Sequence, residues 1–366
     1  PLPCQIWPGE WHRQVRELLT DYRDPCTQFY WMPEPTDEFH ALVRLNNFGL
    51  HAPDYALDKP ADTYRLLVVG DSFPQGMQVV YEQTFPYLLS SLLHPRSGQR
   101  VEVINLSVDA YGTDRELLLY ALLGWRFQPD AVLLSIYMGN DVYDNHINLE
   151  ERRYGYRLER PFFTLEDETL RLHNSPTFDA AQFPNAPPYQ WLMRMQSEQS
   201  PAPPPSLPAR PAVIAPAPNY ALEYPVDLGL YLPEDEHWAD AWALTEALIL
   251  QFRDLVTAQD IPFAALIVPD RRAVHTADWA GTVSQYAAAL PELEQADPVS
   301  PPARMEDFLT AQGIPTLNLT WTLRSWAQSY PDGRLYYAGD GHFNAEGHRV
   351  SAERIALWLT SQNIPG

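Results

Sequence analysis

Short runs of Val, Ile and Leu alternate with helical segments along most of this 366-residue chain. The runs contain few polar residues, which is typical of parallel strands covered by helices on both faces. This alternation predicts a doubly wound, mostly parallel sheet of about five strands in a three-layer, flavodoxin-like α/β arrangement. The predicted strands are 64–69, 101–106, 131–137, 262–268 and 314–319, and the predicted helices are 84–94, 113–127, 240–259, 303–312 and 344–360.

The helix expected at 113–127 carries a start signal of its own. It opens with Thr113-Asp114-Arg115-Glu116, the spacing of a capping box. In that motif the threonine caps the helix and the glutamate reaches back to the amide of the cap residue. We therefore predict that Glu116 accepts a backbone hydrogen bond at this helix terminus.

Two parts of the chain do not follow the strand and helix alternation. Residues 1–63 are rich in aromatic residues and proline, and we expect them to pack on a domain formed by 64–366. An insertion at 150–236 combines a predicted hairpin near 161–172 with a stretch that has eight prolines between Pro201 and Pro218. A segment of this length is typical of a lid, a binding loop or a linker, and a surface decoration is the alternative.

The chain is strongly acidic, with 47 acidic residues against 25 basic ones and a formal net charge of −22. A negative field of this size repels phosphate backbones, so nucleic acid is not expected as a partner. The acidity itself is interpreted as a solubility feature. No apolar segment approaches the ~20 residues that span a bilayer, so no membrane span is expected in these residues.

Cys4 and Cys26 are the only cysteines, and both precede the first predicted strand. A disulfide between them is predicted if the protein is exported, and two free thiols are the alternative. Their spacing matches no metal site, and no cofactor is expected.

The first predicted strand ends at Gly70-Asp71-Ser72, where an open parallel sheet gathers its ligands. A serine hydroxyl is a weak nucleophile at neutral pH and needs a neighbouring base. His342 is the candidate base, because it follows the last strand and directly precedes the last helix. Asp340 is the candidate acid that orients the imidazole. The alternative interpretation is that these polar residues only cap helices.

Two further positions follow neighbouring strands of the same predicted sheet edge. Gly112 comes after strand 101–106, and Asn140 comes after strand 131–137. Attack on an ester carbonyl creates an oxyanion, which preorganised N–H donors stabilise. The amides of Ser72 and Gly112 and the side-chain amide of Asn140 are therefore predicted to form an oxyanion hole.

Four short blocks occur in one order along the chain: Gly70-Asp71-Ser72, Gly112, Gly139-Asn140-Asp141 and Asp340-Gly341-His342. In this order the chain resembles the SGNH (GDSL) hydrolase family over its framework from about 64 to 359, without much of 173–235. The resemblance implies a Ser72 nucleophile, an oxyanion hole of Ser72, Gly112 and Asn140, and a triad completed by His342 and Asp340. The family includes esterases, lipases, carbohydrate deacetylases and acyltransferases.

One block departs from the common family pattern. The family acid usually stands three residues before the histidine, a position that Gly339 occupies here. Asp340 precedes His342 by two residues, a spacing that is known in sugar-modifying relatives. If Asp340 faced away from the imidazole, a dyad of Ser72 and His342 would remain.

Other polar residues near these blocks receive structural interpretations. Asp71 and Asp141 are expected to accept hydrogen bonds at turns, and His348 is expected to be a structural residue of the last helix. Arg271 and Arg272 follow strand 262–268 at the same edge. One of them is a candidate for binding an anionic substrate group, with a surface salt bridge as the alternative.

The resemblance leads us to expect a serine esterase that removes an acyl group, with a carbohydrate O-acetyl ester as the candidate substrate. Aromatic side chains are candidates for stacking on sugar rings, namely Trp7, Trp11, Trp31 and Tyr137. Two alternatives remain open. One is a carbohydrate O-acyltransferase, and the other is a non-catalytic cell-surface structural or glycan-binding protein with this fold.

An exported or cell-surface protein is the expected location. The expectation rests on the two cysteines, on a start at Pro1 that permits a signal or anchor in a precursor, and on the likeness to anchored bacterial proteins. A cytoplasmic location is the alternative.

Overall fold

The computed structural model describes residues 30–31, 38–39, 41, 43–46, 48–95, 98–155, 158, 160–175, 186–198 and 224–365. Cys4, Cys26, Trp7, Trp11 and the proline-rich stretch 201–218 lie outside these described residues. The disulfide, the limits proposed for the N-terminal extension and the exported location therefore stay predictions.

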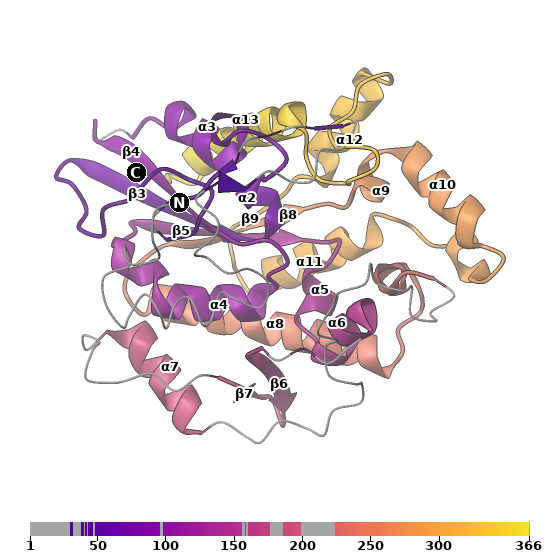
Figure 1. The fold of residues 1–366 in the computed structure, drawn as a ribbon, viewed down its shortest axis with the longest axis horizontal. Coiled ribbons are helices and arrows are strands. Elements are labelled where there is room, and N and C mark those ends of the chain that lie inside the picture. Colours follow the sequence, from indigo (N-terminus) through magenta and orange to yellow (C-terminus); the bar gives the residue numbers. More distant parts are fainter. Residues whose placement is uncertain are drawn as a thin grey trace.

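A five-stranded parallel sheet forms the centre of the fold (Figure 1). Its strands run in the order β4-β3-β5-β8-β9, and every neighbouring pair is parallel. This confirms the predicted α/β class, and each strand lies within two residues of its predicted bounds. The strands are β3 (Thr63–Gly70), β4 (Arg100–Ser107), β5 (Ala131–Tyr137), β8 (Phe263–Val268) and β9 (Thr316–Asn318).

Helices cover both faces of the sheet, because successive strand residues point to opposite sides. In β3, Leu67 and Val69 face one apolar cluster, whereas Leu66 and Val68 face another. The first cluster packs against α4 (Thr113–Leu122), α8 (Glu236–Thr257) and α11 (Ser300–Ala311). The second packs against α3 (Phe85–Leu92), α12 (Thr320–Ser329) and α13 (Ala345–Ser361). The two helix layers lie on either side of the sheet, as the three-layer prediction requires (Figure 1).

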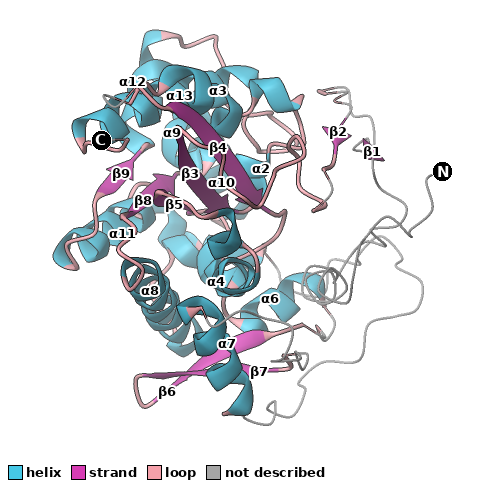
Figure 2. Cartoon of the chain, turned by 90° about the vertical axis from the view of Figure 1, so that its left-hand side faces the viewer, coloured by secondary structure: helices cyan, strands magenta, loops and turns pink. Residues whose placement is uncertain are grey.

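The predicted hairpin of the insertion is present outside the main sheet. It consists of the antiparallel strands β6 (Phe162–Glu166) and β7 (Thr169–His173). Figure 2 shows the hairpin and α7 (Pro187–Ser197) beyond α4 and α8, on the side away from the sheet. Between β5 and the hairpin lie two further helices, α5 (Asp141–Asp144) and α6 (Ile147–Tyr154).

A buried ion network ties the insertion to α4. The guanidinium of Arg160, just before the hairpin, donates to Asp114 at 2.6 Å and to Glu150 at 2.7 Å. Arg115 donates to the other oxygen of Glu150 at 3.0 Å. All four side chains are at most 7% exposed, so each charge depends on its partners. The network fixes the first turn of α4, which begins directly after Gly112.

The predicted capping box is wrong. The N-cap of α4 is Gly112, and the amide of Asp114 donates instead to the side-chain oxygen of Asn145 at 2.9 Å. In the described part of the chain, the hydroxyl of Thr113 and both carboxyl oxygens of Glu116 have no hydrogen-bond partner. The reason is tertiary: Asn145 takes the cap role from another segment, and Glu116 is buried inside the fold.

No helix among the described residues combines the length and the apolar character that crossing a bilayer requires.

Candidate active site

Ser72 stands where strand β3 turns sharply into the short helix α2 (Ser72–Gln75). Asp71 caps this helix, since its Oδ1 accepts from the amide of Phe73 at 3.0 Å, as expected for a turn residue. Gly70 is needed for close packing, because a Cβ there would lie 2.6 Å from Pro74 and 2.9 Å from Ser135. The turn thus holds Ser72 at the carboxyl edge of the sheet, with 5% of its surface exposed.

His342 and Asp340 lie in the loop between α12 and α13 and meet Ser72 from the far end of the chain. The Nε2 atom of His342 is 2.8 Å from Oγ of Ser72. Its Nδ1 is 2.7 Å from Oδ1 of Asp340, which also accepts from the His342 backbone amide at 3.1 Å. With Nδ1 donating to the carboxylate, Nε2 is the acceptor for the serine hydroxyl. The structure therefore brings the three predicted side chains into one hydrogen-bonded chain.

His342 and Asp340 shift each other's pKa values so that each favours the charged form of the other. Burial alone would lower the pKa of His342, but the hydrogen bond and the charge of Asp340 raise it above 6.5. Burial alone would raise the pKa of Asp340, but the contact with His342 lowers it below 3.8. Asp340 is thus ionised at neutral pH, and an imidazolium formed on His342 is stabilised. The ring of His342 also packs on Phe73, with centroids 5.2 Å apart.

Asp71, the neighbour of Ser72, interacts electrostatically with two other buried carboxyl groups, those of Glu116 and Asp141. Oδ2 of Asp71 lies 3.3 Å from Oγ of Ser72, as a more distant alternative acceptor for its single hydroxyl proton, and burial raises the pKa of Asp71 to about 6. Burial and the charge of Asp71 raise the pKa of Glu116 well above 4.5. Burial and the charge of Glu116 raise the pKa of Asp141 well above 3.8. As predicted for a turn residue, Asp141 accepts from the amide of Tyr137 at 2.9 Å.

The three predicted oxyanion donors follow three neighbouring strands, in the order β4-β3-β5. Gly112 follows β4, Ser72 follows β3 and Asn140 follows β5. Among the described residues, no backbone carbonyl accepts from the amides of Ser72 and Gly112, and the side-chain Oδ1 of Asn140 is buried without a hydrogen-bond partner. Gly112 is also packed tightly, since a Cβ there would lie 2.6 Å from Oδ1 of Asn145. These N–H groups keep their donor capacity for a ligand.

The chain is similar to known proteins only at low sequence identity. No family model and no curated protein matches the chain. A lipolytic protein of the G-D-S-L family from Desulfitobacterium hafniense DCB-2 is 11% identical, covers 81% of this chain and 99% of its own, and has a TM-score of 0.38. A GDSL-like lipase from Bacteroides thetaiotaomicron VPI-5482 is 12% identical, with coverages of 84% and 93% and a TM-score of 0.36.

An acetylxylan esterase from Geobacillus stearothermophilus is also similar, with 12% identity, coverages of 81% and 94% and a TM-score of 0.38. The first two proteins carry the name of the family that the sequence motifs resemble. At these identities and TM-scores the likeness carries no argument about the chemistry of this chain.

The two arginines after β8 are both engaged with the protein. Arg272 donates to Asp270 at 2.7 Å and pairs with Asp227 at 2.5 Å, which favours the salt-bridge alternative for this residue. Arg271 donates to the carbonyl of Ala338, just before Asp340. Its predicted contact with substrate stays a prediction, and its observed contact is with the loop that carries the acid.

Two other predicted residues are placed by the structure. His348 is buried, and its Nδ1 accepts from the amide of Phe85 at 3.3 Å. Burial lowers the pKa of His348 to about 3, so the ring is neutral and structural, as expected. Tyr137 lies against Phe73 at a centroid distance of 4.0 Å and donates to Asp270 at 3.1 Å. Trp31 belongs to the short strand β1 (Tyr30–Trp31).

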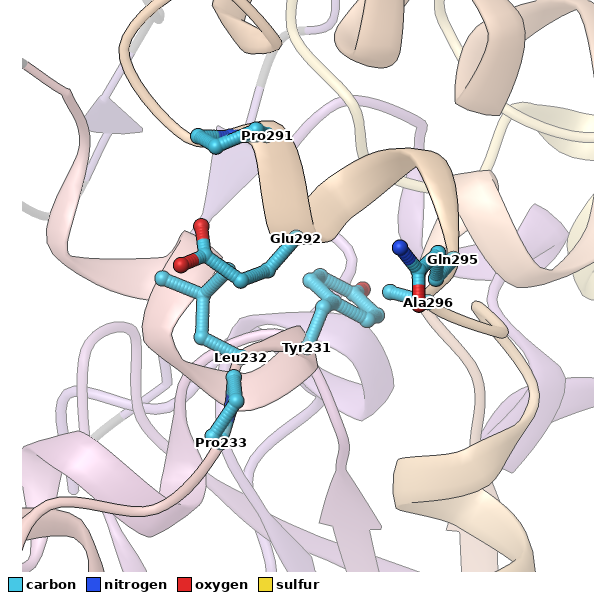
Figure 3. A pocket seen from close by; sticks show the side chains of 7 residues that line it. All are labelled: Tyr231, Leu232, Pro233, Pro291, Glu292, Gln295 and Ala296. Carbon is cyan, nitrogen blue, oxygen red and sulfur yellow. The ribbon is translucent and has the colours of Figure 1, made fainter.

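An open hollow of about 510 Å³ lies between the 3₁₀ turns Val226–Tyr231 and Pro291–Glu294 (Figure 3). None of the site residues lines it. The lining consists of Tyr231, Leu232, Pro233, Pro291, Glu292, Gln295 and Ala296. The hollow is a surface feature separate from the serine site.

Proposed function

We propose that this protein is a serine esterase of the SGNH type that works through an acyl-enzyme on Ser72. The observation that carries the proposal is the continuous hydrogen-bonded chain from Oγ of Ser72 through His342 to Asp340, with distances of 2.8 and 2.7 Å. A histidine that only capped a helix would need neither contact. These three hydrogen-bonded side chains supply a nucleophile, a base within reach of its proton, and an ionised group that orients the base.

The proposed reaction has two steps. Oγ of Ser72 attacks the ester carbonyl carbon while its proton passes to Nε2 of His342, and the same proton then goes to the departing alcohol oxygen. Water next gives a proton to His342 and attacks the acyl-enzyme, and Ser72 regains its proton as the acid leaves. The amides of Ser72 and Gly112 and the side chain of Asn140 stabilise the oxyanion in both steps.

A carbohydrate O-acetyl ester is the substrate class we propose, and it rests on the aromatic content of the chain, 12%. Transfer of the acyl group to a sugar hydroxyl in place of water is the second enzymatic option. The two are separated by product analysis with acetyl donor and an oligosaccharide acceptor, where acylated acceptor indicates transfer and free acetate indicates hydrolysis.

The test of the proposal is the Ser72→Ala variant, assayed with p-nitrophenyl acetate and butyrate. We expect kcat/KM to fall by about 10⁶-fold, as for removal of the nucleophile from a serine triad. Ser351→Ala is the matched control, because Ser351 is also a buried serine but lies on α13 and not in the site. It should leave kcat/KM within about twofold.

Equal hydrolysis by wild type and Ser72→Ala would exclude the mechanism. A fluorophosphonate probe adds an independent readout, because it labels an activated serine and should label Ser72 in the wild type. A Ser72 that resists the probe, together with retained glycan binding, would support the non-catalytic alternative.

A further inference from the structure

The loop that carries Asp340 is short, exposed and flanked by glycines. Ala338, Gly339 and Asp340 are exposed, and Gly341 has a φ of 90°. Glycine on both sides of the acid permits many backbone conformations. Hydrogen bonds inside the loop, from the amide of Tyr337 to the carbonyl of His342 and from the amide of Gly341 to the carbonyl of Tyr337, form a local turn. Contacts from other segments add to this restraint.

Glu38 contacts this loop from a position about 300 residues earlier in the chain. Its carboxylate accepts from the amide of Gly339 at 2.9 Å and from the amide of Asp340 at 3.0 Å. A Cβ on Gly339 would lie 2.9 Å from Oε2 of Glu38, so glycine is what allows this approach. Hydrogen bonds from backbone amides to an ionised carboxylate are stronger than those between neutral groups.

The carboxylate is charged at neutral pH. The amide of Gly339, followed by that of Asp340, holds the pKa of Glu38 below 4.5. Next to it, the ring of Phe39 is buried and lies 5.0 Å from the ring of Tyr337, at the start of the same loop. The ring contact of Phe39 with Tyr337 therefore restrains the start of the segment 337–340. The two backbone hydrogen bonds to Glu38 restrain its end.

The same N-terminal segment also packs beside the serine turn. We call the described residues 38–39, 41, 43–46 and 48–51 the N-terminal strap. Ala41 and Val43 form a buried apolar cluster with Met77, two residues after α2. Nδ1 of His51 is 2.9 Å from the carbonyl oxygen of Gln75, the last residue of α2. The strap therefore contacts the element that carries Ser72 as well as the loop that carries Asp340.

Two other contacts restrain the acid loop. Arg271 donates to the carbonyl of Ala338, and the side chain of Gln78 hydrogen-bonds Asp340. Glu38 differs from both, because it binds the backbone amide of the acid itself.

We propose that Glu38 is a positioning residue of the serine site, which holds Asp340 against His342 by binding the amides of Gly339 and Asp340. The inference rests on the proposed esterase function and deepens it. The strap then sets the distance between the two halves of the site, which come from opposite ends of the catalytic framework.

The central test is the Glu38→Gln variant, which keeps the shape of the side chain but removes its charge. We expect kcat to fall by about tenfold with KM within about twofold, because loss of alignment affects the chemical step more than binding. Glu38→Asp keeps the carboxylate and should recover part of the loss. Glu353→Gln is the matched control, an exposed glutamate on α13 that is paired with Arg349, and should change neither constant.

A double-mutant cycle with Asp340→Asn identifies the route of the effect. If Glu38 acts through Asp340, Glu38→Gln should cost less than about twofold in the Asp340→Asn background. A full tenfold loss in that background would overturn the positioning role and would indicate an independent effect on the loop.

An NMR titration of the His342 imidazole gives a readout that does not need esterase activity. The acids that act on this ring are Asp340, Asp109 and Asp71, with Asp340 first. Loosening Asp340 should therefore lower the pKa of His342 in Glu38→Gln, with no further shift when Asp340 is already asparagine. An unchanged His342 pKa together with an unchanged kcat would refute the inference.

The titration also separates the esterase hypothesis from the positioning role of Glu38. If the wild type shows no Ser72-dependent hydrolysis, the proposed function fails, and the His342 titration still decides the role of Glu38. If Ser72→Ala is inactive and Glu38→Gln behaves as wild type in both measurements, the esterase stands and only the positioning role fails.

Discussion

Nδ1 of His342 lies 2.7 Å from Oδ1 of Asp340, although only Gly341 separates the two residues in the chain. The contact is possible because Gly341 has a φ of 90°, a conformation that favours glycine. The same carboxyl oxygen also accepts from the His342 backbone amide at 3.1 Å. The acid and the base thus form one local turn, and only the serine comes from elsewhere in the chain.

Asp340→Asn should reduce kcat by roughly 10²- to 10⁴-fold, because the neutral amide neither stabilises an imidazolium nor selects the required tautomer. Kinetics with p-nitrophenyl acetate measure the effect, and thermal unfolding checks that the fold is retained. Activity near the wild-type level would show that Ser72 and His342 act as a dyad.

The value of kcat/KM should rise with pH as His342 loses its proton, which gives an acidic limb in the pH profile. The neutral form of His342 is the base, and its pKa is raised above 6.5, so half-maximal kcat/KM is expected above pH 6.5. In Asp340→Asn the limb should move to lower pH as this pKa falls. The contribution of the His342–Asp340 contact to stability is present between about pH 3.8 and 6.5. It is lost as pH rises through the raised pKa of His342 and as pH falls through the lowered pKa of Asp340. A limb that is identical in both proteins would assign it to another group.

Glu116→Gln should stabilise the protein in a pH-dependent way. Burial raises the pKa of Glu116 in the folded state above 4.5, so stability falls as pH rises above 4.5 and the unfolded chain loses its proton first. The free energy of unfolding of the variant should match that of the wild type near pH 4 and exceed it at pH 8, where the wild type must keep this buried carboxyl group protonated or bury its charge.

Urea unfolding at the two pH values measures this difference, with the exposed Glu353→Gln as the control. A destabilisation of equal size at both pH values would show that the carboxyl group of Glu116 is needed for another contact.

Arg160→Met should destabilise the fold by about 3–5 kcal/mol, because it leaves the carboxylates of Asp114 and Glu150 buried without this partner. Arg349→Met is the contrast. Arg349 pairs with Glu346 and Glu353 on the surface of α13, and its loss should cost at most about 1 kcal/mol. Equal midpoints of chemical unfolding for the two variants would contradict the assigned role of the buried network.

Gly112→Ala should reduce both kcat and stability. The added Cβ would lie 2.6 Å from Oδ1 of Asn145, the atom that caps α4, so either this side chain or the backbone of residue 112 must move. We expect a loss of about tenfold or more in kcat. Gly281→Ala, within α10 (Thr276–Tyr286), meets nothing within 4 Å and should raise stability by up to about 1 kcal/mol. Kinetics and thermal unfolding of both variants test the contrast.

The sheet was predictable because its signal is local. Each strand is a run of apolar residues that report their own burial, so β5 has the same bounds in sequence and structure. Helices with weaker apolar patterns were not predicted, such as α10, which has no fully buried residue. The capping box failed because α4 begins one residue earlier than the local pattern indicates: its N-cap is Gly112, and Asn145, more than 30 residues away, accepts from the amide of Asp114.

In the candidate site too, some features follow from local sequence and others from contacts between distant residues. The residue types of the site, their order and their common position at the carboxyl edge of the sheet could be inferred from local patterns, because strand ends and glycine turns depend on neighbouring residues. The pairing of Ser72 with His342, the internal ion pair of Arg272 and the contact of Glu38 with the Asp340 loop could not be inferred in this way. These contacts join residues separated by tens to hundreds of positions, and only the packing of the folded chain brings such residues together.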